Sequence, residues 1–202
     1  MTLLKTTTST SKSDFLGFFE AGIVDVTDRS DEFEWADAFL DVTFNLKGSQ
    51  FPQIHSIKGS FDKGPDGALE INRVVRHLNY FFDAIGFTGG LNTMGTWENA
   101  DGTLIASIEN QLNNHINELN GSSNPLIDPP FDHYIYLYRE PPKEVNGKSY
   151  KRVLAKITSN DEAGHKELQS YVDFMKLKGY LKEADSNSTP STSENTGPID
   201  KF

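Results

Sequence analysis

An alternating stretch at residues 133–157 constrains the fold more than any other part of the chain. Its first half, residues 133–139, alternates tyrosine with isoleucine and leucine. Because neighbouring side chains of a strand point to opposite faces, this pattern predicts a strand with one tyrosine face and one aliphatic face. A connection with Pro-Pro and Asn-Gly follows, and residues 148–157 again alternate apolar with polar or basic residues. The stretch therefore predicts a two-stranded antiparallel hairpin.

The predicted hairpin is basic in an acidic chain. Residues 133–156 contain six Lys or Arg and two Glu, which gives a local charge of +4. The whole chain carries −10, so the residues outside this stretch carry −14. Single-stranded nucleic acid is bound by aromatic rings that stack on bases and by cations that follow the phosphates. The hairpin therefore predicts a nucleic-acid surface made of Tyr134, Tyr136, Tyr138, Arg139, Lys143, Lys148, Tyr150, Lys151, Arg152 and Lys156.

A packing role for the same tyrosines is equally compatible with the sequence. Tyrosine is common in strands because it packs well on a pleated sheet, so the tyrosine face could lie beneath another part of the chain. Trp35 and Phe39 could extend a stacking surface, although the neighbouring Asp37 and Asp41 would repel phosphate. If the aromatic surface meets a protein instead of DNA, the chain is a protein-interaction or structural accessory module.

Three further strands and three helices are predicted from the spacing of apolar residues. The strands fall at residues 22–27, 39–46 and 51–61, and the helices at 70–85, 104–119 and 160–184. Three strands, a helix and two strands is the element order of an OB-fold. We therefore expect an α+β protein with an OB-fold-like five-stranded antiparallel barrel, an inserted loop-helix segment within residues 86–130 and a C-terminal helix. Another α+β domain with an antiparallel sheet is the alternative.

Length and composition indicate a single domain with polar ends. The chain has 202 residues, and both ends are rich in Ser and Thr. We expect a disordered segment at residues 1–14, a domain at 15–184 and a disordered tail at 185–202. The absence of cysteine excludes disulfides and thiolate metal sites and suits a cytoplasmic setting, which is the host cytoplasm if the protein is viral. No apolar run in the sequence is long enough to span a bilayer.

Signals of catalysis are weak. The five histidines stand singly, without the spacing of a zinc site, and neither a nucleophilic cysteine nor a Gly-x-Ser-x-Gly motif is present. We therefore expect a binding protein that is not an enzyme and that needs no cofactor or metal.

The chain ends in a polar tether with a hydrophobic tip, in which Pro198, Ile199, Asp200 and Phe202 are the notable residues. This layout resembles the single-stranded DNA-binding proteins of phages and bacteria, which combine an OB-fold core with a flexible tail ending in Phe. The resemblance implies binding of single-stranded DNA without strong sequence specificity, in replication, recombination or repair. It also implies that the tail engages replication or recombination proteins. Lys201 interrupts the acidic tip expected of such a tail.

Overall fold

The computed structural model describes residues 16–121, 130–144 and 147–184. The predicted disordered segments, 1–14 and 185–202, lie outside the described residues. The tail residues Pro198, Ile199, Asp200 and Phe202 lie there too, so their predicted role is neither supported nor contradicted by the fold.

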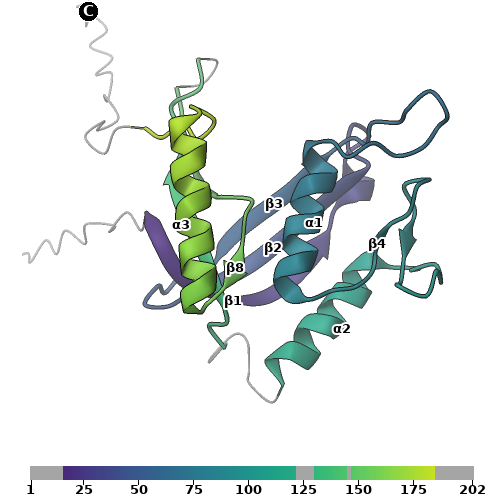
Figure 1. The fold of residues 1–202 in the computed structure, drawn as a ribbon, viewed down its shortest axis with the longest axis horizontal. Coiled ribbons are helices and arrows are strands. Elements are labelled where there is room, and N and C mark those ends of the chain that lie inside the picture. The colour runs from purple at the N-terminus through teal and green to yellow at the C-terminus, as the bar shows by residue number, and fades with distance from the viewer. Residues whose placement is uncertain (1–15, 122–129, 145–146, 185–202) are drawn as a thin grey trace, which may run out of the picture.

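A mixed α+β architecture with one large antiparallel sheet confirms the coarse prediction of the fold (Figure 1). The sheet has the order β3-β2-β1-β6-β7, with β8 pairing β6 as a sixth strand. Its strands are β1 (Gly17–Asp28), β2 (Ala38–Leu46), β3 (Gln53–Gly59), β6 (His133–Arg139), β7 (Lys151–Val153) and β8 (Thr158–Ser159). The sheet does not form a closed barrel, because no ladder joins β3 to β7 among the described residues, so the predicted OB-fold-like five-stranded barrel is not confirmed.

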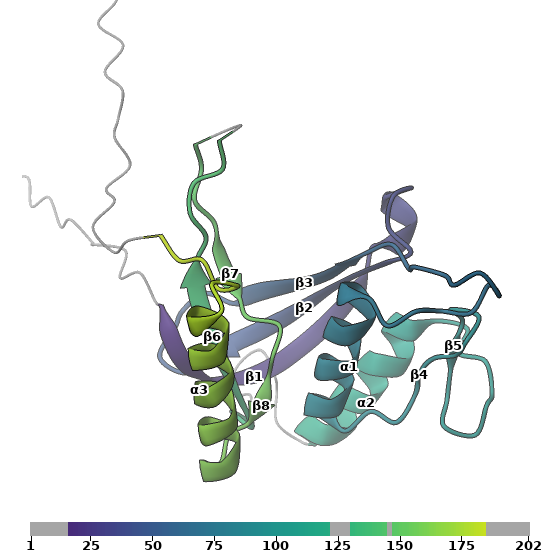
Figure 2. The ribbon, with the colours of Figure 1, turned by 45° about the horizontal axis from the view of Figure 1, so that its top comes forward.

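The remaining elements are three helices, a short hairpin and one 3-10 turn. They are η1 (Ser30–Glu32), α1 (Arg73–Ile85), β4 (Gly90–Leu91), β5 (Trp97–Glu98), α2 (Ile108–Asn120) and α3 (Glu162–Leu177). Figure 2 shows α1 and α2 side by side at one end of the sheet, with α3 at the other end against β6. In its described part, the inserted segment predicted within 86–130 therefore contains the β4–β5 hairpin and α2.

Strand β1 joins the two halves of the sheet. Residues 17–21 pair with β6 and residues 21–28 pair with β2, with an irregularity in register between Ile23 and Asp25. The sequence predicted only residues 22–27 as strand. The first half was missed because Phe18 and Phe19 are both covered, Phe18 by the tyrosines of β6 and Phe19 by the main core. A strand covered on both faces lacks the alternation that identifies a half-buried one.

The main core lies between the sheet and the helices α1 and α2. Phe44 of β2, Phe81 of α1 and Leu112 of α2 are all fully buried there. The α2 side chain of Asn113 holds the backbone of Val26 in β1, accepting from its N–H at 2.8 Å and donating to its carbonyl at 2.8 Å. These two hydrogen bonds satisfy the N–H and carbonyl groups of Val26, which no neighbouring strand pairs.

A second, smaller core forms beneath α3. It consists of Tyr136, Leu154, Leu168, Val172 and Leu181, with Phe18, Tyr134 and Tyr138 packed at its margin. By the alternation of residues 148–157, Leu154 would share a strand face with Arg152 and Lys156. The strand β7 ends at Val153, however, and Leu154 packs under α3 instead.

Helix α1 begins later than predicted because Asn72 caps it. The Asn72 side chain accepts from the N–H groups of Val74 and Val75, as Asn commonly does at a helix start. Gly86 ends the helix with a left-handed φ of 66°. Ile71 lies within the predicted helix 70–85 and has the spacing of its buried stripe, but it precedes the cap and its side chain is 69% exposed.

The observed start of α1 predicts a large loss of stability for one alanine substitution, at Leu78, and almost none for another, at Ile71. Leu78→Ala removes a buried side chain from α1 and should lower the free energy of unfolding by about 2–5 kcal/mol. Ile71→Ala should change it by less than about 0.5 kcal/mol, because the side chain is exposed. Urea denaturation of both variants measures the difference. Equal losses would place Ile71 in the core and contradict the observed start of α1.

Candidate nucleic-acid interface

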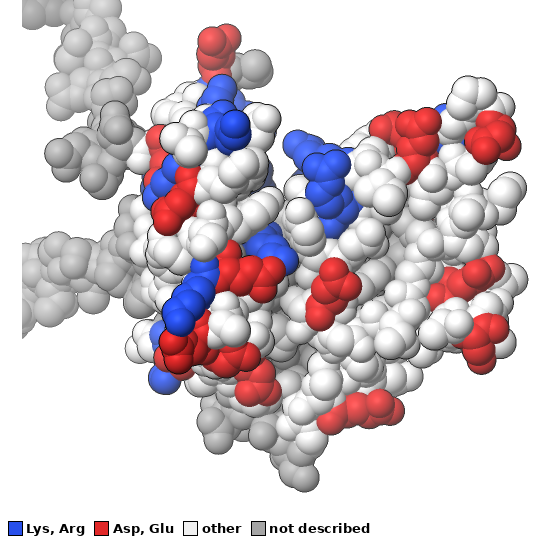
Figure 3. Space-filling model, viewed as in Figure 1, with Lys and Arg blue, Asp and Glu red and all other residues white. Residues whose placement is uncertain are grey.

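A hollow between α1 and α3 gathers basic and aromatic side chains from three segments. Figure 3 shows Lys and Arg side chains on both sides of this depression and within it. Its floor is the chain from β7 to β8, which runs between the two helices (Figure 1). We define the α1–α3 hollow by Arg73, Arg76 and Tyr80 of α1, Arg152 and Lys156 of the floor, and Tyr171 of α3.

Helix α1 presents three of these residues on one side. Arg73, Arg76 and Tyr80 are spaced by three and four, so their side chains emerge from neighbouring turns. Both arginines are exposed, and neither makes a salt bridge with a described residue. Their cations are therefore open to an external anion.

The two helices meet through an aromatic pair with a lysine beside it. The rings of Tyr80 and Tyr171 are in edge contact, with centroids 6.1 Å apart. The Lys156 Nζ lies 5.1 Å from the centre of the Tyr80 ring and 2.7 Å from the Glu167 carboxylate. The pair therefore joins α1 to α3 and holds a cation at the bottom of the hollow.

Arg152 supplies the second cation of the floor. Its Nε donates to the Glu140 carboxylate at 3.1 Å, and its guanidinium lies 5.6 Å from the centre of the Tyr150 ring. Ion pairs with this degree of exposure contribute about 0–1 kcal/mol each. A phosphate can therefore replace Glu140 at Arg152, or Glu167 at Lys156, at little cost.

Cations of the hollow act on two titratable groups beside it, although burial is the larger cause of each pKa shift. Burial, together with Arg73 and Arg76, lowers the pKa of His77 from its ordinary value of 6.5 to about 4. Burial raises the pKa of Tyr138, with Glu140 adding to the rise and Arg152 and Arg73 opposing it. Cations of α1 and of β7 thus act on the same phenol, so the two segments are electrostatic neighbours.

Most of the predicted tyrosine face is covered. Tyr136 is only 6% exposed, donates to the Glu183 carboxylate and accepts from Lys176 Nζ at 3.0 Å. Tyr134 lies between Phe18, whose ring is stacked on it at 5.7 Å, and His165, whose ring centre is 3.8 Å away. In this arrangement Tyr136 cannot stack on a base, and the packing role left open by the sequence accounts for both side chains.

The other predicted contacts are spread along the hairpin. Tyr138 lies in an open groove beside Lys143 and Tyr180. Arg139 and Lys151 are directly opposite each other on β6 and β7. Three side chains are exposed near the tip, namely those of Lys143, Lys148 and Tyr150. Of the ten predicted residues, the structure brings Arg152 and Lys156 into the α1–α3 hollow.

Sequence reasoning missed the contributions of the helices. Arg73 and Arg76 stood out only as basic residues off the apolar stripe, and Tyr80 and Tyr171 were not singled out as site residues. Tyr80 shares the spacing of the two arginines, which is a usable signal. Its contact with Tyr171 is not predictable from local patterns, because the two residues lie on different helices far apart in the chain.

His55 lies on β3 near the floor of the hollow. Its ring hydrogen-bonds to the backbone of Val153 in β7, while Nε2 has no partner among the described residues. The hydrogen bond is therefore made by Nδ1, and it links β3 and β7, the strands at the two ends of the sheet. Burial lowers the pKa of His55 from 6.5 to about 4, and His77 and Arg152 contribute in the same direction.

Two negative observations concern the described ranges only. No group of three or more His, Asp or Glu side chains is arranged there to hold a metal ion. None of the helices in those ranges is long and apolar enough to cross a membrane.

The buried imidazole predicts a loss of stability in mild acid. The unfolded chain takes up a proton at His55 near pH 6.5 and the folded chain only near pH 4. Between these values the unfolded state binds more protons, so the free energy of unfolding should be roughly 2 kcal/mol lower at pH 5 than at pH 7 from this group. In His55→Asn, which keeps a donor for Val153, urea denaturation should show that much less dependence on pH. An unchanged dependence would contradict a buried neutral His55.

Comparisons of the chain with protein-family models, with curated proteins and with solved structures gave no match. Its function is therefore inferred from the geometry and charge of its own residues.

Proposed function

We propose that the protein binds single-stranded DNA without strong sequence specificity and has no enzymatic activity. The observation that carries the proposal is the α1–α3 hollow. There, two exposed arginines without a carboxylate partner among the described residues lie near the Tyr80–Tyr171 pair and near the cations of Arg152 and Lys156. Cations for the phosphates and flat rings for the bases are the two requirements for binding a single strand.

The charges of the hollow fit a flexible anionic strand. Arg73 and Arg76 offer immediate phosphate contacts, and Arg152 and Lys156 add two more when phosphates displace Glu140 and Glu167. Tyr150, which is 38% exposed, lies beside Arg152 and offers a ring to a neighbouring base. The hairpin residues Lys143 and Lys148 are exposed and can extend the path towards its tip.

The arrangement of the strands supports an OB-fold-like core for this activity. Strand β3 lies against β7, although the two are at opposite ends of the sheet order, and His55 links them. This contact between the two end strands is compatible with a partly open barrel, in which α1 and α2 are inserted between β3 and β6. OB-folds are five-stranded, partly open barrels that commonly bind oligonucleotides.

The cellular role that follows is protection of unwound DNA during replication, recombination or repair, in a phage or bacterial setting and in the cytoplasm. The tail, with Pro198, Ile199, Asp200 and Phe202, would recruit partner proteins or compete with DNA for the basic hollow. The composition of the tail and its resemblance to known single-stranded DNA-binding proteins support this part of the proposal.

A second candidate function rests on an aromatic cluster at the β1–β2 connection. Phe39 is buried, the half-buried Phe33 is stacked on it at 4.5 Å, and Trp35 beside them is 55% exposed. The surrounding acidic residues, Asp31, Glu32, Glu34 and Asp37, disfavour phosphate. This cluster fits a protein partner, as expected for a protein-interaction module.

Fluorescence anisotropy with a labelled oligo-dT tests the proposal. We expect binding at low salt that weakens as salt rises from about 50 to 200 mM, with a logarithmic slope near −3 for about four phosphate contacts. The double variant R73E/R76E should bind about tenfold or more weakly and flatten the slope by about 0.7 for each lost contact. Absence of binding by the unaltered chain at low salt would overturn the proposal.

A matched control separates the hollow from the net charge of the protein. The double variant K47E/K58E makes the same change in charge, but Lys47 pairs with Glu20 and Lys58 lies over the Phe39 ring. Its affinity for oligo-dT should stay within about twofold of the unaltered protein, because distant surface charges are screened by salt. A loss equal to that of R73E/R76E would remove the hollow from the binding site.

A further inference from the structure

A groove separate from the α1–α3 hollow lies where the end of α3 meets the connection between β6 and β7 (Figure 2). Its volume is about 330 Å³, which is within the range of ligand sites, about 300–1,000 Å³. We define the hairpin groove by the residues that line it, which are Tyr138, Glu140, Pro141, Lys143, Tyr180 and Lys182. It offers two rings and two lysines, the same kinds of side chain as the hollow.

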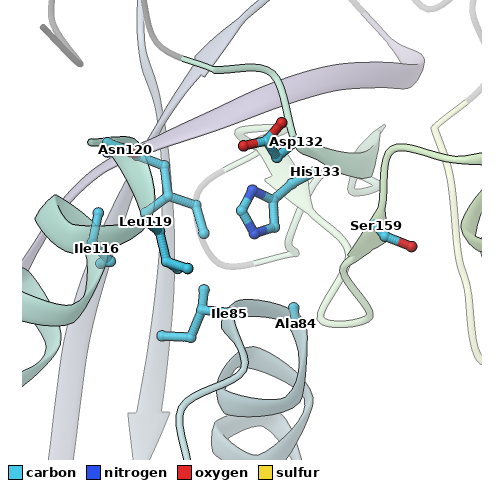
Figure 4. Close-up of a pocket in the computed structure, with 9 residues that line it drawn as sticks. Ala84, Ile85, Ile116, Leu119, Asn120, Asp132, His133 and Ser159 are labelled. Atoms are coloured by element: carbon cyan, nitrogen blue, oxygen red, sulfur yellow. The ribbon is translucent and has the colours of Figure 1, made fainter. Parts of the chain in front are cut away.

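The pocket at the ends of α1 and α2 has a different chemistry (Figure 4). Its walls are mostly apolar and include Ile85, Ile116 and Leu119. No Lys or Arg is among the described residues that line it, whereas the carboxylate of Asp132 is. A phosphate chain is therefore disfavoured there, and of these two cavities the hairpin groove is the one that suits an anionic strand.

The segment that follows α3 forms one wall of the hairpin groove. Gly179 turns the chain out of the helix with a left-handed φ of 68°. Leu181 is buried in the core beneath α3, while its neighbours Tyr180 and Lys182 are exposed. The N–H of Ala184 then donates to a carbonyl of β6 at 2.8 Å. The segment is thus fixed at both ends, so this wall is part of the folded domain.

The rings and cations of the groove are available to a ligand. Tyr180 is 68% exposed, and its ring is in edge contact with that of Phe174, with centroids 6.5 Å apart. Lys143 and Lys182 are exposed, and neither makes a salt bridge with a described residue. Tyr138 is half-buried and lines the same groove. The side chains needed to hold a base and a phosphate therefore face the same open space.

The hairpin groove continues from the α1–α3 hollow through Arg152. Tyr138 and Arg152 are directly opposite each other on β6 and β7, so their side chains share one face of the sheet. Glu140 of the groove accepts from Arg152 Nε at 3.1 Å. Two further acids, Glu144 and Glu183, are next to the groove lysines in sequence but do not line the groove. Three cations therefore outnumber one carboxylate along this path.

On the basis of the proposed function, we propose that the hairpin groove holds the nucleotides that leave the α1–α3 hollow at Arg152. One base stacks on Tyr180 and the next packs against Tyr138, while Lys143 and Lys182 contact the phosphates. A strand long enough to reach the groove therefore binds more tightly than one that fills the hollow alone. Stacking on an aromatic ring tolerates every base, so the groove adds affinity without adding sequence specificity.

Anisotropy with oligo-dT of two lengths tests the groove in the full-length protein. Lengths of about 6 and about 16 nucleotides lie within the range of site sizes of OB-folds. The long oligonucleotide should bind at least about fivefold more tightly, after correction for its larger number of binding registers, because it gains one stacked base or more. In K143E/K182E this difference should disappear, and the affinity for the short oligonucleotide should stay within about twofold, because distant charges are screened. Equal affinity of the unaltered protein for both lengths would overturn the proposal.

Two variants of Tyr180 distinguish stacking from apolar contact. Tyr180→Phe keeps the flat ring and Tyr180→Leu removes it, and the exposed position means that neither should alter the fold. Tyr180→Leu should bind the long oligonucleotide about fivefold or more weakly, as expected for the loss of one stacked base. Tyr180→Phe should stay within about twofold of the unaltered protein. Equal affinities of the two variants would exclude stacking on Tyr180 and overturn the proposal.

The same measurements separate the hairpin groove from the DNA-binding function itself. If R73E/R76E weakens binding while K143E/K182E and Tyr180→Leu bind as the unaltered protein does, the hollow binds DNA and the groove is excluded. Absence of binding by the unaltered protein would overturn both. The control K47E/K58E makes the same change in charge and should keep the dependence on length. Loss of that dependence in K47E/K58E would attribute it to net charge and overturn the role of the groove.

Discussion

The pairing of β1 with two different strands is the constraint on which the rest of the structure depends. At Ala21 the strand faces Leu46 of β2 on one side and His133 of β6 on the other. Before this point β1 belongs to the half-sheet with β6, and after it to the half-sheet with β2. The irregularity between Ile23 and Asp25 lies just beyond the change of partner. Such irregularities bend a strand and increase its twist.

The position of the hollow follows from this bend. The curved sheet brings β7 against β3, where His55 links the two strands. Helix α1 follows β3 in the chain and α3 follows β8, so the helices end on either side of the segment that carries Arg152 and Lys156. The basic surface is thus a product of sheet curvature, and it contains residues that are distant in sequence.

Local patterns in the sequence predicted the elements with a visible alternation or helical repeat, including β6, whose tyrosines alternate with aliphatic residues although both of its faces are covered. Strand β2 and helix α1 were found within a few residues, because each alternates or repeats its apolar residues towards one core. The first half of β1 was missed because Phe18 and Phe19 pack on opposite sides. The candidate site was predicted in part for the same reason. Arg152 and Lys156 belong to a recognisable hairpin, whereas α3 covers Tyr136 through contacts that no local pattern encodes.

The central claim is that a single strand of DNA lies in the α1–α3 hollow. Photocrosslinking with oligo-dT that carries 4-thiothymine, followed by mass spectrometry of the peptides, tests it most directly. We expect crosslinks at Tyr80, Tyr171 or Tyr150 and none at Tyr136, which is covered by α3. Crosslinks confined to Trp35 and its neighbours, or to Tyr134 and Tyr136, would contradict the account.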